Sequence, residues 1–163
     1  MKVAFWNLEK DLNGIPTVVR TREWESVEKV NLELVMPEMV FEFARKVIKA
    51  DSLLEEYVWI IPVNVKNIVL GVMEVNHGSM EKSVLTTRDI FRRLLLVGAQ
   101  SFFLVHNHPS GDPRPSLDDC SITTNIQKAG ELMNIKMVDH IIVGGEEKYF
   151  SFREGNYGGE NAK

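Results

Sequence analysis

The hydrophobic pattern along the chain alternates between the short period of strands and the longer period of helices. Apolar, β-branched runs at residues 57–63 and 68–75 are joined by Asn64-Val65-Lys66-Asn67, which predicts a β-hairpin. Further strands are predicted at 83–85, 101–106, 138–143 and 149–152. Apolar residues at helical spacing predict helices over 37–48, 86–97 and 116–133. This alternation indicates a layered α/β domain with a mixed sheet.

The residues at the ends of the predicted helices are ones that favour helix termini. Pro37 opens the first helix at a position where its missing N–H has no consequence. Thr86 and Asp89 resemble a capping box at the start of the second helix, and Gly98 follows its end. Ser116 is the predicted start of the third helix.

The pattern divides the chain into an arm, one domain and a tail. Residues 1–36 contain short β-like pieces interrupted by Asn13-Gly14 and Pro16, so we predict an extended arm or edge strands. Residues 37–155 carry the alternating strands and helices and form the predicted domain. Residues 156–163 are rich in glycine and asparagine and are expected to be a flexible tail.

The composition narrows the class of protein. The 163 residues are 44% hydrophobic and 26% charged, which suits one domain with a full core. The net charge of −4 argues against a dedicated duplex-DNA binder, because phosphate neutralisation supplies most non-specific affinity. The single cysteine, Cys120, excludes an internal disulfide and a cysteine-rich zinc site.

Neither a membrane span nor a secretion signal is predicted. The longest apolar runs, such as residues 58–63, fall far short of the ~18 residues that a membrane helix requires. The apolar stretch at the N-terminus is too short for the core of a signal peptide. A cytoplasmic location is therefore the default expectation.

Two histidines carry the first chemical signal. His106 and His108 lie where an apolar strand runs into a loop, and in extended backbone both imidazoles point to the same side. The loop that follows is stiffened by prolines and leads into a helix whose first turn carries Asp119. Two histidines and one carboxylate suit zinc and leave a fourth position for water, as in catalytic zinc sites.

Each part of this pattern also has a purely structural explanation. A His-x-His pair at the end of a strand is by itself a weak signal for a metal. Ser116 and Asp119 fit an N-terminal capping box, and Asp119 suits the positive end of the helix dipole. None of these explanations accounts for the histidine pair, the proline-containing loop and the Ser-x-x-Asp sequence together.

The complete spacing resembles a known family. His106-Asn107-His108, seven residues, Ser116, two residues and Asp119 reproduce the His-x-His-x7-Ser-x2-Asp motif of the JAMM (JAB/MPN) metalloproteases. The stretch 106–116 resembles the RadC-type branch of that family, as do residues 138–144 and 150–154. The resemblance covers about residues 37–155 and implies a single three-layer domain of JAB/MPN, cytidine-deaminase-like architecture.

The resemblance also implies roles for individual residues. His106, His108 and Asp119 would hold one Zn²⁺ per chain. Glu74, a carboxylate within an apolar run, matches the family's glutamate on an earlier strand and would activate the zinc-bound water. Ser116 would donate a hydrogen bond to the developing oxyanion. The chain is thus expected to be a JAMM-type zinc metallopeptidase that cleaves peptide or isopeptide bonds in a peptide or protein substrate.

The sequence leaves other functions open. RadC-type proteins carry a DNA-repair label, so the alternative is a DNA-repair-associated accessory protein whose metal site binds without turnover. Fuller members of the family carry an N-terminal helix-hairpin-helix module, and residues 1–36 are too short and too β-like to form one. The net charge does not support a nucleic-acid partner. The substrate and the oligomeric state are not predicted.

Overall fold

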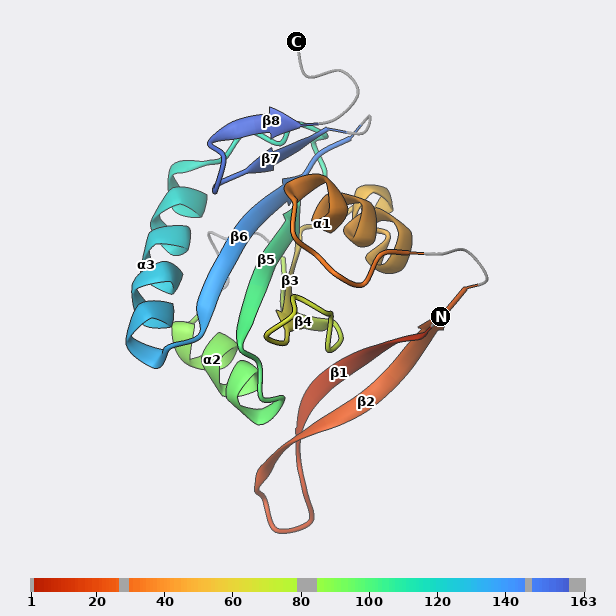
Figure 1. Ribbon diagram of the computed structural model, residues 1–163, viewed down its shortest axis with the longest axis vertical. Coiled ribbons are helices and arrows are strands. Elements are labelled where there is room, and N and C mark those ends of the chain that lie inside the picture. Colours follow the sequence, from red (N-terminus) through yellow and green to blue (C-terminus); the bar gives the residue numbers. More distant parts are fainter. Residues whose placement is uncertain (1, 27–29, 79–84, 146–147, 159–163) are drawn as a thin grey trace.

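A six-stranded mixed sheet forms the centre of the protein, in the strand order β4-β3-β5-β6-β7-β8 (Figure 1). The computed structural model describes residues 2–26, 30–78, 85–145 and 148–158. Its elements are β1 (Lys2–Lys10), β2 (Pro16–Glu25), α1 (Pro37–Phe43), the π-helical turn η1 (Ala44–Ile48), the short turn η2 (Ala50–Ser52), β3 (Tyr57–Val63), β4 (Met73–His77), α2 (Thr87–Leu96), β5 (Ser101–Asn107), α3 (Leu117–Met133), β6 (Lys136–Val143), β7 (Tyr149–Ser151) and β8 (Asn156–Gly158). Strands β5 and β6 are parallel, and the other neighbouring pairs are antiparallel. The predicted α/β architecture with a mixed sheet is confirmed.

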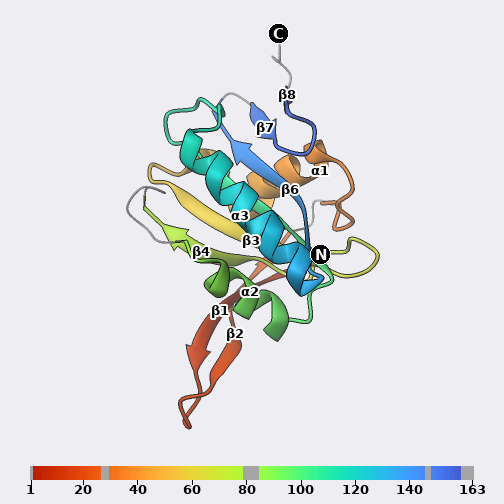
Figure 2. The same ribbon diagram turned by 90° about the vertical axis from the view of Figure 1, so that its left-hand side faces the viewer.

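Helices cover both faces of this sheet. Helix α1 and η1 pack on one face, whereas α2 and α3 cover the other (Figures 1 and 2). Alternate residues of the central strands enter two separate cores, so that Trp59 and Val105 face α1 while Val58 and Leu104 face α2 and α3. Because β3 and β5 are buried on both faces, their sequences are continuous apolar runs.

The N-terminal residues form a hairpin that projects from the domain. Strands β1 and β2 pair antiparallel (Figure 1). A parallel bridge between Phe5 and Val72 joins β1 to the segment immediately before β4. Val3 and Phe5 are buried in the core beneath α1. At Gly71 a Cβ atom would lie 2.2 Å from Trp6 Nε1, so this close approach requires glycine. The segment predicted as an extended arm or edge strands is thus largely a docked hairpin.

Two strand boundaries differ from the sequence prediction. Strand β4 begins at Met73 rather than at residue 68, because Val69 and Val72 bridge to Val63 and Phe5 outside the main ladder. Residues 156–158 of the predicted flexible tail pair with β7 as β8. The predicted strand at 83–85 falls mostly outside the described residues, since 79–84 are not among them. In the part of the chain that is described, no helix is long and apolar enough to cross a membrane.

Candidate metal centre

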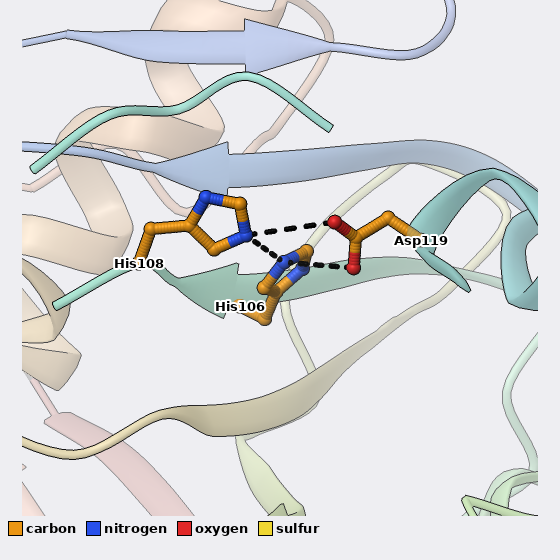
Figure 3. Close-up of side chains that lie close together, drawn as sticks. All are labelled: His106, His108 and Asp119. Atoms are coloured by element: carbon orange, nitrogen blue, oxygen red, sulfur yellow. Dashed lines mark hydrogen bonds and ion pairs between the residues drawn. The ribbon is translucent and has the colours of Figure 1, made fainter. Parts of the chain in front are cut away.

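Three side chains that can bind a metal converge where β5 ends and α3 begins. His106 lies near the end of β5, His108 follows it, and Asp119 lies in the first turn of α3. Figure 3 shows the two imidazoles and the carboxylate pointing toward one another. Within the described ranges these residues form a group whose ligand atoms all lie within 4.8 Å of one another, and it could hold a metal ion.

The separations in this group match those of a tetrahedral zinc site. The Nε2 atoms of His106 and His108 are 2.9 Å apart. The distance from His106 Nε2 to Asp119 Oδ1 is 3.3 Å, and that from His108 Nε2 to Asp119 Oδ2 is 3.5 Å. Tetrahedral ligand atoms with zinc bonds of ~2.0 Å lie roughly 3.3 Å apart. The three residues therefore fit zinc.

The backbone holds each ligand in place. His106 is paired on both sides within the sheet, with Val58 on β3 and Ile142 on β6. The His108 N–H donates to the Val143 carbonyl at 2.9 Å, which fastens the start of the loop to β6. The loop also packs on the turn after β6, where a Cβ on Gly144 would lie 2.6 Å from the Gly111 carbonyl oxygen.

Ser116 places Asp119 through a capping box at the start of α3. Its hydroxyl accepts from the Asp119 N–H at 3.1 Å and donates to Asp119 Oδ2 at 2.7 Å. The Ser116 N–H donates to the same carboxylate oxygen at 2.7 Å. The predicted cap is present, and in this arrangement the hydroxyl hydrogen is directed to Asp119. The predicted oxyanion role of Ser116 stays a prediction.

The electrostatics of the group favour a bound cation. Burial raises the pKa of Asp119, but the imidazoles of His106 and His108 and the Ser116 hydroxyl outweigh burial and hold it well below its ordinary value. The carboxylate is therefore charged although it is almost fully buried. Burial lowers the pKa of His108, but Asp119, the Asp112 carbonyl and Glu56 outweigh it and raise the net value. The site thus attracts positive charge, which a metal ion supplies.

The hydrogen on His108 is fixed by a backbone carbonyl. His108 Nδ1 lies 2.7 Å from the Asp112 carbonyl oxygen, which can only accept a hydrogen bond. Nδ1 therefore carries the hydrogen, and in the neutral ring Nε2 is left with a lone pair directed at Asp119 and His106. A bare Nε2 is the form of imidazole that binds zinc.

His140, which lies in the stretch 138–144 that resembles the RadC-type branch, contacts His106 from the side away from Asp119 and His108. Its Nε2 is 2.8 Å from His106 Nδ1, and its Nδ1 is 2.6 Å from the Thr123 hydroxyl oxygen. The ring is fully buried and stacks on Phe152 with centroids 4.7 Å apart. Burial lowers the pKa of His140 well below its ordinary value, so the ring is neutral.

The structure does not bring Glu74 to this group. Glu74 pairs with Trp59, which pairs in turn with Val105, and this row faces α1. His106 pairs with Val58, which faces α2 and α3. Directly paired residues share a face of the sheet, so the exposed Glu74 carboxylate lies on the opposite face from His106. The register therefore gives the predicted base no position near the three ligands.

Glu56 is the carboxylate that the register places on the ligand side. It lies two residues before Val58, so continuing the antiparallel pairing sets Glu56 opposite His108 on the same face. Its charge contributes to the raised pKa of His108. The side chain is half-buried. The sequence signal that could have found it is an acidic pair, Glu55-Glu56, immediately before a buried strand.

Asn107, the residue between the two histidines, holds the backbone on both sides of Glu56. Its Oδ1 accepts from the Tyr57 N–H at 2.8 Å, and its Nδ2 donates to the Glu55 carbonyl at 2.9 Å. Asn107 is itself almost fully buried. His106 and His108 therefore supply two candidate ligands from one face of the strand. Asn107, on the opposite face, fixes the backbone that carries the Glu56 carboxylate.

These features define a class: layered α/β domains that assemble two histidines and an aspartate between a strand end and a helix N-terminus. A family model described as the RadC-like JAB domain matches residues 34–157, which is most of the chain. The chain therefore belongs to the RadC-like JAB domain family.

Curated relatives agree with this assignment. A UPF0758 protein of Desulforudis audaxviator is 37% identical over 143 residues, covering 86% of this chain and 57% of the relative. A UPF0758 protein of Chlorobaculum parvum is 35% identical over 127 residues, covering 78% and 56%. A third, from Clostridium beijerinckii, is 40% identical over 104 residues, covering 64% and 45%. The chain thus spans about half the length of the curated relatives that it matches.

Proposed function

We propose that this chain is a zinc-dependent hydrolase of peptide or isopeptide bonds, with His106, His108 and Asp119 as ligands and Glu56 as the general base. The observation that carries the proposal is the convergence of the three side chains: the two Nε2 atoms are 2.9 Å apart, and each lies 3.3 or 3.5 Å from one of the two Asp119 carboxylate oxygens, distances that suit one tetrahedral ion. Membership of the RadC-like JAB family supports a hydrolytic reaction.

The burial of the ligands indicates the side from which a substrate enters. The side chains of His106 and Asp119 are 0% and 2% exposed, whereas that of His108 is 17% exposed. Glu56 is also half-buried and lies next to His108 in the register. The open side of the group is thus the side where the base lies. A zinc ion with three protein ligands supplies a Lewis acid and makes water more acidic.

Glu56 performs the proton transfers in the proposed reaction. Its carboxylate accepts a proton from the attacking water and returns that proton to the amine that leaves when the C–N bond breaks. Asn107 keeps the Glu56 backbone in place during both transfers, because its amide bonds to the residues on either side. Ser116 holds the Asp119 carboxylate, and its hydroxyl reaches an oxyanion only after turning away from Asp119 Oδ2.

The experiment that tests this proposal uses two glutamates on opposite faces of the sheet. The zinc-loaded protein is screened against libraries of peptides and isopeptide-linked peptides, together with Glu56→Gln and Glu74→Gln. We expect one zinc per chain in all three proteins, and cleavage by the wild type and Glu74→Gln. Loss of a catalytic base typically lowers the rate by about 10²–10⁴-fold, and we expect this for Glu56→Gln.

Several outcomes would contradict the proposal. A wild-type protein that binds no zinc, or that keeps its zinc after His106→Ala, removes the metal site. Equal cleavage by the wild type and Glu56→Gln removes the base, and loss confined to Glu74→Gln returns that role to Glu74. Stoichiometric zinc with no cleavage of any library member favours the alternative of a site that binds without turnover.

A further inference from the structure

The hydrogen bonds behind His106 form a chain of three polar groups. His106 Nδ1 contacts His140 Nε2 at 2.8 Å, His140 Nδ1 contacts the Thr123 hydroxyl at 2.6 Å, and that hydroxyl contacts the Asp119 carbonyl oxygen at 2.6 Å. His106, His140 and Thr123 are 0%, 0% and 3% exposed. Such burial leaves each group dependent on the next for its hydrogen bond.

The direction of this chain is not set at the two imidazoles, because a neutral imidazole can donate from either nitrogen. The direction is set where the chain of hydrogen bonds ends, at the Asp119 carbonyl oxygen. The Asp119 carbonyl oxygen can only accept, and the Thr123 hydroxyl has one hydrogen. An oxygen–oxygen distance of 2.6 Å without an intervening hydrogen would be repulsive, so the hydroxyl donates to the carbonyl.

The direction of this hydrogen bond determines which nitrogen carries the hydrogen on His140 and then on His106. With its hydrogen used, the Thr123 oxygen accepts from His140 Nδ1–H. Neutral His140 then has a bare Nε2, which accepts from His106 Nδ1–H. His106 Nε2 is left with a lone pair and, like His108 Nε2 at 2.9 Å, faces the Asp119 carboxylate without a hydrogen, an arrangement that is repulsive until a cation lies among the three groups.

We propose that Thr123 and His140 are positioning residues that fix the tautomer of His106, so that its Nε2 stays bare for a metal ion. The proposal rests on the metal site of the proposed function but not on the reaction. The two ligand histidines are then set by different acceptors: His108 by a backbone carbonyl, and His106 by a relay that ends on the carbonyl of Asp119. Stacking on Phe152 at an interplanar angle of 4° holds the His140 ring in the orientation that the relay needs.

Replacing the hydroxyl by a methyl group tests the relay directly. In Thr123→Val the Asp119 carbonyl keeps its helical partner, but His140 Nδ1 loses its acceptor. We then expect His140 to carry its hydrogen on Nε2 and donate to His106 Nδ1, which moves the His106 hydrogen to Nε2. A ligand nitrogen that carries a hydrogen does not bind zinc, so zinc affinity falls. Loss of such a partner typically weakens metal binding by about 10–100-fold.

Two readouts and two controls make this measurable. Two-bond ¹H–¹⁵N correlation spectra of the zinc-free protein report the tautomer of each of its four histidines, and competition with a chromophoric chelator reports zinc affinity. Thr123→Ser keeps the hydroxyl and is expected to match the wild type. Thr124→Val makes the same change on the next residue of α3, whose exposed hydroxyl donates to the Cys120 carbonyl oxygen, and is expected to have no effect.

The proposal is overturned if the wild type shows Nε2–H on His106 or His140. It is equally overturned if Thr123→Val keeps the wild-type tautomers and zinc affinity, or if Thr123→Ser loses affinity as much as Thr123→Val does. If Thr123→Val does not fold, the wild-type spectrum alone decides the question. A protein with the expected tautomers that cleaves no substrate refutes the proposed reaction and leaves the relay standing.

Discussion

Asp139 is a buried carboxyl group that organises the segment next to His140. Its Oδ1 accepts from the backbone N–H groups of His140 at 2.7 Å and Arg153 at 2.9 Å, and its Oδ2 accepts from the Ser151 hydroxyl at 2.7 Å. Burial raises the pKa of Asp139, although these three hydrogen bonds oppose the shift. The native state therefore holds a proton on this group more tightly than the unfolded chain does.

This pKa shift gives a prediction with a definite sign. Because the folded pKa is raised, Asp139 contributes stability at low pH that is lost as the pH rises from about 4, the ordinary value for aspartate, through the raised value. In Asp139→Asn the group is neutral at every pH. The free energy of unfolding of the wild type relative to Asp139→Asn should therefore fall as the pH rises above about 4.

Urea unfolding of the zinc-free proteins at a series of pH values measures this difference. A difference that is constant with pH, or that grows as the pH rises, would show that burial does not raise the pKa of Asp139 in the folded protein.

At this scale the sequence brings the three candidate metal ligands together, but it does not place Glu74 beside them. His106 and His108 are two apart in one strand, so local geometry suffices to put their side chains on the same face. The face on which Glu74 lies depends instead on how β4 pairs with β3, and that ladder has a register shift between Val58 and Trp59. A shift of one residue moves a side chain to the other face, and nothing local to the sequence records it.

The N-terminus of α3 is the element that delivers the third ligand. Its capping box shares two hydrogen bonds with the cap of α2, where the Thr86 hydroxyl accepts from the Asp89 N–H at 3.1 Å and donates to Asp89 Oδ2 at 2.6 Å. Only the cap of α3 holds a carboxylate that faces the two histidines, that of Asp119. Comparing the two caps therefore distinguishes the contribution of a cap to helix stability from its contribution to the metal site.

Ser116→Ala and Thr86→Ala should each lower the free energy of unfolding by about 1 kcal/mol, because each leaves a helix N-terminus without its side-chain acceptor. Only Ser116→Ala should weaken zinc binding, because it also frees the Asp119 carboxylate to leave the position in which the ligands converge. Urea unfolding and chelator competition measure the two effects. Equal zinc affinities in the two variants would mean that the cap does not position Asp119.

Helices and central strands are predictable because their signals are local. The caps at Thr86 and Ser116 and the buried runs of β3 and β5 all appear in the structure where the pattern places them. The errors lie at strands whose extent is set by a distant partner. Strand β8 has three residues and forms by pairing with the edge of β7, and β4 begins only at Met73 because Val72 bridges to Phe5 of the hairpin.

For the molecule as a whole, the hairpin is part of the folded unit rather than an appendage. Phe5 is 7% exposed and packs in the core that α1 covers, although it lies on the projecting hairpin. The tip of the hairpin, by contrast, exposes Leu12 fully. Truncation of the buried Phe5 and of the exposed Leu12 should therefore have very different effects on the free energy of unfolding.

Phe5→Ala should lower the free energy of unfolding by about 3–5 kcal/mol, as expected for a buried phenylalanine. Leu12→Ala should leave it within about 0.5 kcal/mol of the wild type. Urea unfolding followed by tryptophan fluorescence and by circular dichroism measures both. If Phe5→Ala costs no more than Leu12→Ala, the hairpin folds independently of the domain.

The distribution of the site along the chain has a consequence for how this protein could change over time. Every proposed ligand, and the hydrogen-bonded chain behind His106, lies in the continuous segment β5-α3-β6, whereas Glu56 lies immediately before β3. In the proposed function, metal binding and catalysis therefore depend on separate stretches of the sequence. If the proposed function holds, a single substitution of Glu56 abolishes the reaction without weakening metal binding, so relatives with intact ligands and no turnover can arise by one mutation.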